Sequence, residues 1–220
     1  MADHHDHTHD HTHTRDNDYD HATDPDLDGY TLLEGEVWEA ALRELLLEKG
    51  VITPPELKNQ MDRTASQSAA VGASIIARAW KDQKFKKALL ANPKATIANL
   101  GHDVSTMPDL VIVENRVDVH NVVVCTLCSC YPRYMRGPPP EWYRSAAYRA
   151  RVVRDPREVL IEFGLNISAE TTIRVYDSTA DLRYMVMPLC PPSAEDMPVT
   201  LLQTIITRDS MIGVGLPKLP

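Results

Sequence analysis

Apolar side chains recur at helical spacing between residue 30 and about residue 100. Val37, Ala41 and Leu45 stand four residues apart, which places them on one face of an amphipathic helix. Gly50 ends this pattern, and residues 53–56 (Thr-Pro-Pro-Glu) have the spacing of a capping box with proline at the first helical position. The pattern therefore predicts two consecutive helices, one on either side of Gly50.

Two further helices are expected before the helical pattern of apolar residues ends. Residues 65–80 are rich in alanine and serine, which favours a helix that packs closely against its neighbours. Asp82 is placed to cap a fourth helix, and Gly101 closes this half of the chain.

After Pro108, runs of β-branched residues replace the helical pattern. Runs of this kind predict strands where polar residues or proline bound them. They occupy residues 110–115, 120–127, 171–177 and 182–188.

Loops and helices are expected around these strands. Residues 137–142 (GPPPEW) predict an extended loop, residues 145–163 a helix broken at its Asp-Pro step, and residues 197–207 a last helix. The sequence therefore predicts an α+β fold, with a helical arm over residues 30–108 and a compact α+β domain over residues 109–220.

Residues 1–29 hold almost no large apolar side chain. Seven of the nine histidines lie there among many aspartates: His4, His5, His7, His9, His11, His13 and His21. Such a segment buries too little surface to offset its ordering entropy, so we expect it to be disordered. Two roles stay open, a metal-scavenging tail, since imidazoles and carboxylates bind divalent ions, and a solubilising tail.

Charge and hydropathy exclude some classes of function. The net charge of −8 argues against nucleic acid as a partner, and no apolar run has the length of a membrane span. The first residues do not resemble a signal peptide, so we expect a cytoplasmic protein. In a reducing compartment, four cysteines of which three are clustered indicate metal or redox chemistry rather than a disulfide framework.

The stretch VCTLCSCYPR contains the cluster, Cys125, Cys128 and Cys130. Structural zinc and iron–sulfur sites take four ligands, and only His120 or Cys190 offers a fourth. A Cys-x-x-Cys redox pair usually opens a helix, whereas this stretch follows a predicted strand. A further possibility is a Cys-Ser-Cys turn whose backbone amides complete a three-thiolate site, which favours a trivalent ion with one open position. Spacing alone leaves these alternatives open.

VCTLCSCYP resembles the metal-binding motif of the nitrile hydratase family, in the catalytic alpha-type subunit. VIVEN, HNVVVCTLCSCYP, PPPEWYRSAAYRARVVRDPREVL, VYDSTADLRYMVMP and TRDSMIG look like segments of this family in the family's order, so the resemblance spans most of residues 37–213. The threonine at position 126 resembles the cobalt-type members of the family, because iron-type members carry serine at this position. The resemblance implies a helical arm that wraps a partner subunit and an α+β domain that presents the metal at the interface.

The resemblance also implies a ligand set for non-corrin Co(III). Cys125 would be the axial thiolate, Cys128 would be oxidised to a sulfinate and Cys130 to a sulfenate. Ser129 and Cys130 would supply backbone amide nitrogens.

Three acids are carried over as residues that surround the metal ligands. Asp177 and Asp181 match acidic positions of the family, although glutamate is common at the second, and Glu114 is expected to be another such acid. For each of them the alternative is a solvated charge at the end of a strand. Trp142 and Tyr143 are expected to pack in the core rather than contact substrate.

The residues after the motif depart from the pattern of members that act on organic nitriles. Those members have Tyr-Pro-Trp-Pro and an aliphatic stretch, whereas this chain has Arg133 and Arg136. Two cations beside an open coordination position favour an anion, and thiocyanate is the obvious anionic C≡N compound. The gamma subunit of thiocyanate hydrolases also has Tyr-Pro-Arg and an Asp/His-rich tail.

We therefore expect Cys130, Arg133 and Arg136 to act on thiocyanate, which gives carbonyl sulfide and ammonia. Conversion of organic nitriles to amides stays open, because the stretch VENRVDVHN before the motif is more like an ordinary nitrile hydratase. For the two arginines, salt bridging at a subunit interface stays open as well.

The resemblance also implies other proteins. Arginines of a beta-type partner subunit neutralise the oxidised sulfurs in the family, so we expect a hetero-oligomer and no activity of this chain alone. A maturation protein would load the cobalt. The non-enzymatic alternative is a metal-binding or redox-sensing subunit without turnover.

Overall fold

The computed structural model describes residues 32–65, 68–127 and 130–219. The predicted tail over residues 1–29 lies outside this part of the chain. The elements in chain order are α1 (Leu32–Glu48), α2 (Pro54–Ala65), α3 (Ala70–Lys81), α4 (Gln83–Ala91), α5 (Pro93–Ala98), β1 (Asp109–Glu114), β2 (Val119–Val124), α6 (Arg133–Arg136), α7 (Glu141–Arg144), α8 (Ala146–Arg154), α9 (Pro156–Glu162), β3 (Thr172–Asp177), β4 (Leu182–Met187), a 3-10 turn (Pro192–Ala194), α10 (Val199–Ile205) and α11 (Arg208–Ile212).

The predicted caps set the helix boundaries. Before α2, the backbone N–H of Thr53 donates to the Glu56 carboxylate at 2.8 Å, which is one half of the expected capping box. Asp82 accepts from the backbone N–H of Phe85 at 2.9 Å and starts α4. Asp155 separates α8 from α9 at the Asp-Pro step, as predicted, because proline is favoured at the first position of a new helix.

The four strands form two parallel pairs. β1 pairs with β4 and β2 pairs with β3, each over six residues in register. A short turn reverses the chain between β1 and β2, and another reverses it between β3 and β4. The carboxyl ends of β2 and β3 therefore lie at the same edge as the amino ends of β1 and β4, where the Asp109 N–H donates to the Asp181 carbonyl at 2.9 Å.

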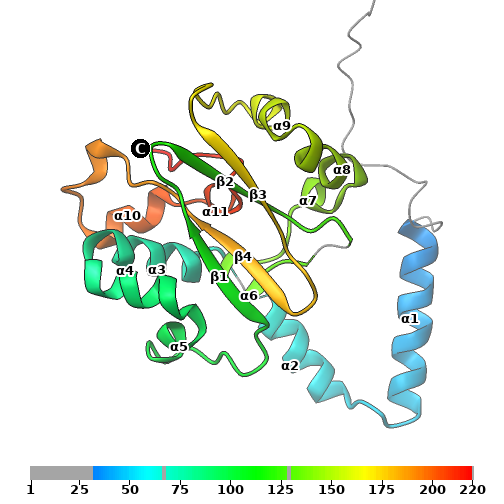
Figure 1. The fold of residues 1–220 in the computed structure, drawn as a ribbon. Helices are drawn as coiled ribbons and strands as arrows, with labels where there is room; N and C mark the ends of the chain where they lie inside the picture. Colours follow the sequence, from blue (N-terminus) through cyan, green and yellow to red (C-terminus); the bar gives the residue numbers. More distant parts are fainter. Residues whose placement is uncertain (1–31, 66–67, 128–129, 220) are drawn as a thin grey trace, which may run out of the picture.

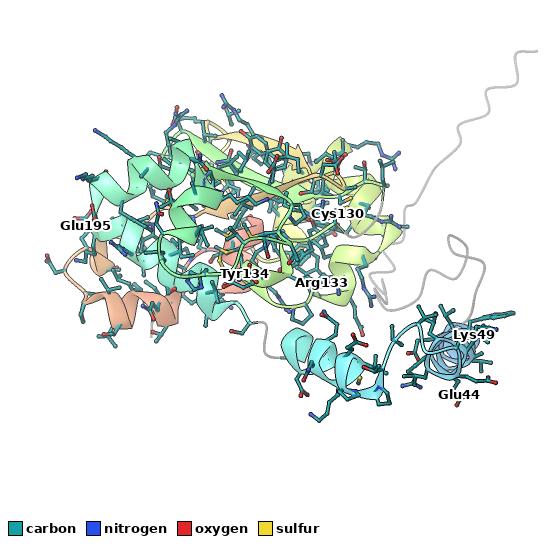
Figure 2. The ribbon with its side chains drawn as sticks, turned by 90° about the horizontal axis from the view of Figure 1, so that it is seen from below. Glu44, Lys49, Cys130, Arg133, Tyr134 and Glu195 are labelled. Carbon is teal, nitrogen blue, oxygen red and sulfur yellow. The ribbon has the colours of Figure 1, made fainter. Side chains whose placement is uncertain are left out.

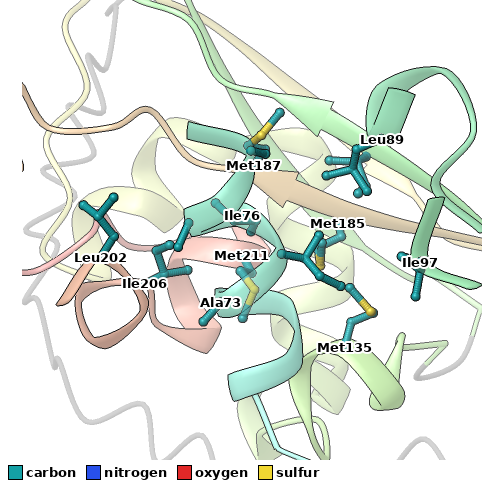
Figure 3. Packing of buried hydrophobic residues seen from close by; sticks show 14 of the residues in the cluster. Ala73, Ile76, Leu89, Ile97, Met135, Met185, Met187, Leu202, Ile206 and Met211 are labelled. Atoms are coloured by element: carbon teal, nitrogen blue, oxygen red, sulfur yellow. The ribbon is translucent and has the colours of Figure 1, made fainter. Parts of the chain in front are cut away.

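Helices cover the strands from two sides. α3, α4, α5 and α10 lie on one side, and α7, α8 and α9 lie on the other (Figure 1). The larger apolar cluster joins α3, α4, α5, α10 and α11 to β1 and β4 and is rich in methionine. Figure 3 shows Met135, Met185, Met187 and Met211 in this cluster around Ala73 and Ile76 of α3.

A second cluster carries the loop that follows β2. It is formed by β2, α7, α8 and α9 together with the end of α11. Tyr131, Tyr143 and Tyr148 belong to it, and their rings pack edge to face or tilted against one another with centroids 5.0 to 5.7 Å apart.

Behind β2, a buried polar network fixes α11 against the strand. A ring nitrogen of His120, Nε2, lies 2.7 Å from the carbonyl of Gly213, and Nδ1 lies 3.2 Å from the amide of Asn115. Because a carbonyl only accepts, Nε2 carries the proton and Nδ1 accepts from Asn115. The side-chain carbonyl of Asn115 accepts the backbone N–H of Asn121 at 2.8 Å, so the buried polar groups of this network are mutually satisfied.

The helices of the segment predicted as an arm, residues 30–108, do not all lie in the same place. α1 and α2 extend away from the body, whereas α3, α4 and α5 pack into the main cluster (Figure 1). Several side chains of α1 are exposed although they are large and apolar, among them Val37, Trp38, Leu42 and Leu45. No helix in residues 32–65, 68–127 and 130–219 is long and apolar enough to cross a membrane.

The structure differs from the prediction at one strand end and in several short helices. The expected strand over residues 120–127 ends at Val124. α6 stands before the predicted extended loop over residues 137–142, and α7 begins inside it. Neither α5 nor α11 was predicted. α6, α7 and α11 have four or five residues each, too few for a periodic pattern. Each buries part of its residues, and α11 also has a capping box at Thr207.

Candidate metal centre

The cysteine loop begins where β2 ends. Val124, the last residue of β2, pairs with Asp177, the last residue of β3, and Ser178 N–H donates to the Val124 carbonyl at 2.7 Å. Parallel strands bring both carboxyl ends to one edge, so the loop that starts at Cys125 and the turn that starts at Ser178 lie side by side. The end of β3 therefore lies beside the start of the cysteine loop.

The Cys125 end of the loop is held by Asp177. Cys125 is 1% exposed. One carboxylate oxygen of Asp177 accepts the backbone N–H of Thr126 at 2.9 Å, and the other accepts the Thr126 hydroxyl at 2.5 Å. This two-point contact orients the residue that directly follows the first thiol.

The Cys130 end of the loop is held by Tyr143. The Tyr143 hydroxyl donates to the Cys130 carbonyl at 3.2 Å from a fully buried ring. The neighbouring Tyr148 hydroxyl donates to the carbonyl of Val123 at 2.9 Å, just before the loop. Burial raises the pKa of both tyrosines well above the usual value, so both stay protonated and both remain donors.

The second half of the predicted ligand set, Cys128 and Ser129, lies outside the described residues. Within the residues that are described, no group of three His, Cys, Asp or Glu side chains is gathered around one point. Cys125 and Cys130 are the two thiols of the set that can be placed, one buried and one half-buried, on a loop fixed at both ends. A short, anchored loop with partly shielded sulfurs fits a metal that takes thiolate ligands.

The two arginines after the loop occupy different environments. Arg133 begins α6 and is exposed. Figure 2 shows it in the body with Cys130, away from α1. Arg136 ends the same helix and is 1% exposed. The structure therefore presents only the first of the two charges to solvent.

The three predicted acids are also separated. Asp177 contacts the loop, as described above. Asp181 lies in the β3–β4 turn at the same edge, with an exposed side chain. Glu114 lies elsewhere: its carbonyl accepts the side-chain N–H of Asn121, which is four residues, or about 13 Å of strand, before Cys125. The Glu114 carboxylate forms an ion pair with Lys86 beside a separate cavity of about 400 Å³ that Trp80 and Cys190 also line.

Sequence reasoning missed the roles of the tyrosines. Tyr143 was expected to pack in the core, and it does, but its hydroxyl also contacts the loop. The contact could have been suspected from the residue type. A tyrosine hydroxyl in the core needs a hydrogen-bond acceptor, and the backbone carbonyls of the cysteine loop are nearby acceptors.

Comparison with known proteins gives the same assignment along most of the chain. The family described as nitrile hydratase, alpha chain, matches residues 34–215. The low-molecular weight cobalt-containing nitrile hydratase subunit alpha of Rhodococcus rhodochrous is 42% identical over 181 residues, covering 82% of this chain and 87% of that protein. The thiocyanate hydrolase subunit gamma of Thiobacillus thioparus is 39% identical over 194 residues, covering 83% and 80%.

Solved structures of both kinds of enzyme share the fold. A recombinant thiocyanate hydrolase with partially modified cobalt centres matches with a TM-score of 0.79 at 38% identity, over 84% of this chain and 90% of that one. A double mutant of the Fe-type nitrile hydratase from Comamonas testosteroni Ni1 matches with a TM-score of 0.80 at 38% identity, over 87% and 94%. The family predicted from the VCTLCSCYP motif and the α+β fold are thereby confirmed, and the chain belongs to the nitrile hydratase alpha-chain family.

Proposed function

We propose that this chain is the metal-binding catalytic subunit of a cobalt enzyme that adds water to the C≡N bond of thiocyanate. The family supports hydration of a C≡N bond as the class of reaction. The choice of thiocyanate rests on one observation: Arg133 is an exposed cation three residues after Cys130. An exposed guanidinium at this point attracts an anion more strongly than a neutral nitrile.

Cys125, Cys128, Cys130 and the backbone amides of Ser129 and Cys130 would hold the cobalt, with Cys128 as sulfinate and Cys130 as sulfenate. Bound there, a trivalent cobalt ion supplies a Lewis acid for the C≡N group. Support comes from the cobalt-containing relative of Rhodococcus rhodochrous, from the cobalt centres of the solved thiocyanate hydrolase, and from the loop that Asp177 and Tyr143 fix at its ends.

The chain's own residues have distinct tasks in this proposal. Arg133 attracts and orients the anion. The sulfenate oxygen of Cys130 accepts a proton from the attacking water. Asp177 and Tyr143 hold the loop, so that the sulfurs keep their positions during turnover. One thiocyanate and two waters give carbonyl sulfide, ammonia and hydroxide, which balances atoms and charge.

A second candidate function is the alpha subunit of a nitrile hydratase that converts organic nitriles to amides. The observation in its favour is the greater identity to a cobalt-containing nitrile hydratase subunit, 42%, than to the thiocyanate hydrolase subunit, 39%. A difference of three percentage points is small, and it is spread over the whole chain. We weight the local change at Arg133 above it because substrate contacts are local.

We propose further that the enzyme is a cytoplasmic hetero-oligomer that is loaded with cobalt by a maturation protein. The relatives are named as subunits, which supports a partner. The exposed apolar residues of α1 offer a surface for that partner.

The test uses the full chain purified together with its partner subunit. Metal analysis is expected to give one cobalt per chain. Mass spectrometry of the peptide that contains Cys125, Cys128 and Cys130 is expected to show two added oxygens on the second cysteine and one on the third. Zinc with unoxidised thiols would support the non-catalytic alternative and overturn the enzyme proposal.

Substrate choice is tested by Arg133→Trp. We expect this change to lower kcat/KM for thiocyanate by at least about tenfold, which is 1.4 kcal/mol of lost transition-state stabilisation, and to change the rate with a neutral nitrile less. Equal losses with both substrates would remove the anion argument and favour the nitrile hydratase reading.

A further inference from the structure

Arg136 is a cation in an environment that does not favour one. It is 1% exposed and lies between the two apolar clusters. Among the ion pairs of residues 32–65, 68–127 and 130–219, none includes Arg136. Burying a charge without a counter-charge is unfavourable, so this guanidinium needs compensation from another source.

The contacts of Arg136 offset only part of this cost. One terminal nitrogen donates to the carbonyl of Met211 at 2.9 Å and the other to the carbonyl of Tyr184 at 3.4 Å. The guanidinium carbon lies 4.0 Å from the centre of the Tyr131 ring, a cation–π contact. The third nitrogen, Nε, is buried and has no hydrogen-bond partner in the part of the chain that the structure describes.

The Tyr131 ring links this cation to the cysteine loop. Tyr131 directly follows Cys130 and is 6% exposed. Its ring packs edge to face against Tyr143 with centroids 5.0 Å apart, and the Tyr143 hydroxyl donates to the Cys130 carbonyl. Arg136 is therefore linked to Cys130 by two routes, along the chain from Tyr131 and through the contacts of the two rings.

We propose that Arg136 is a positioning residue of the metal loop, which holds the Tyr131 ring behind Cys130 and supplies a buried positive charge to the sulfur centre. This inference rests on the proposed function. One thiolate, one sulfinate, one sulfenate and two deprotonated amides would carry more negative charge than one trivalent ion neutralises. A buried guanidinium stacked on Tyr131, the residue after Cys130, would offset part of that excess. Arg136 thus has a role separate from that of the exposed Arg133.

The experiment compares Arg136→Met, Arg136→Lys and Arg174→Met in the cobalt-loaded complex with the partner subunit. Arg174 is a matched control, because it is an exposed arginine on β3. Four quantities are measured: cobalt per chain, the rate of cobalt loss to a chelator, the wavelength of the sulfur-to-cobalt charge-transfer band, and Tm.

Arg136→Met is expected to lose cobalt at least about tenfold faster than the unmodified complex and to shift the charge-transfer band, since both the ring contact and the charge are lost. Arg136→Lys keeps the charge but loses the planar stacking on Tyr131. Its rate of cobalt loss and its band position are therefore expected to lie between those of Arg136→Met and those of the unmodified complex. Arg174→Met is expected to match the unmodified complex in cobalt retention and band position.

An Arg136→Met complex that keeps the original band and rate of cobalt loss, with only a lower Tm, would reduce Arg136 to a packing residue and overturn the proposal. If this variant does not fold, Tyr131→Leu is compared with Tyr131→Phe, which keeps the ring: faster cobalt loss in Leu alone supports the proposal, and equal rates overturn it. An unmodified complex that holds no cobalt would instead overturn the proposed function, and this inference with it.

Discussion

Both carboxylate oxygens of Asp177 accept hydrogen bonds from one residue, Thr126. At the residue scale this is the clearest link between the loop and the rest of the fold, because the two hydrogen bonds fix the backbone and the hydroxyl of Thr126 together. Hydrogen bonds to a charged acceptor are stronger than neutral ones, although exposure of Asp177 moderates the gain here.

We predict that Asp177→Ala loosens the Cys125 end of the loop more than Asp181→Ala does. The change removes both bonds to Thr126, whereas Asp181 lies in the neighbouring turn with an exposed side chain. Amide hydrogen exchange of the peptide 120–131 should become about tenfold faster in Asp177→Ala. Equal exchange in the two variants would show that the carboxylate does not hold the loop.

At the scale of elements, α11 is fixed to β2 by a close backbone approach. Gly213 ends α11 with φ of +97°, and a Cβ there would lie 2.0 Å from the carbonyl oxygen of Asn121. A side chain at this position is thus excluded both by the left-handed backbone and by the strand.

We predict that Gly213→Ala destabilises the chain by about 3 kcal/mol, because the helix must move away from the strand. Gly215→Ala is the matched control: the nearest atom to its Cβ is 3.4 Å away, and a change within about 0.5 kcal/mol is expected. Urea unfolding of both variants measures the difference. A Gly213→Ala chain as stable as Gly215→Ala would contradict the close approach.

The His120 network predicts a loss of stability in acid. Burial lowers the pKa of His120, although the Gly213 carbonyl opposes this shift. The unfolded chain, with an ordinary histidine pKa of about 6.5, therefore binds the proton before the folded chain does. The contribution to stability is complete above that value and is lost as pH falls below it, by at most about 1.4 kcal/mol per pH unit.

This acid dependence is measured by urea unfolding between about pH 7.5 and 5.5 for the unmodified chain and for His120→Gln. The variant cannot take up the proton, so its free energy of unfolding should depend less steeply on pH in this window. Identical slopes in the two chains would mean that His120 does not carry the effect.

At the scale of the whole molecule, α1 and α2 extend from the body, and α1 leaves large apolar side chains exposed. α1 exposes Trp38 by 67% and Leu42 by 57%, and it stands apart from the body in Figure 1. Large apolar residues grouped on one projecting helix indicate an interface with another chain.

We predict that a double variant, Trp38→Glu with Leu42→Glu, prevents assembly with the partner subunit and leaves the Tm of the isolated chain within about 2 °C. Light scattering after size-exclusion chromatography measures the assembly. Val117→Glu, on an exposed residue of the β1–β2 turn, is the control and should assemble normally. Normal assembly of the double variant would exclude α1 as the interface.

Several helix boundaries and the family could be predicted from local sequence. The caps at Thr53, Asp82 and Asp155 define helix boundaries because each signal lies within three residues of the group that it satisfies. The family could be predicted from VCTLCSCYP because the identity and spacing of its cysteines are local and specific.

Other features depend on distance through space, which no local pattern encodes. The sequence gives Arg133 and Arg136 the same charge three residues apart, yet only the packing of α6 against Tyr131 and α11 exposes one and buries the other. Likewise Asp177 and Glu114 both end strands, but the parallel pairing of β2 with β3 brings only the first to the cysteine loop. The sequence by itself thus determined the family and predicted the donor atoms, whereas the tertiary structure decided which charges are buried and which contact the cysteine loop, because burial and contact are properties of the folded chain.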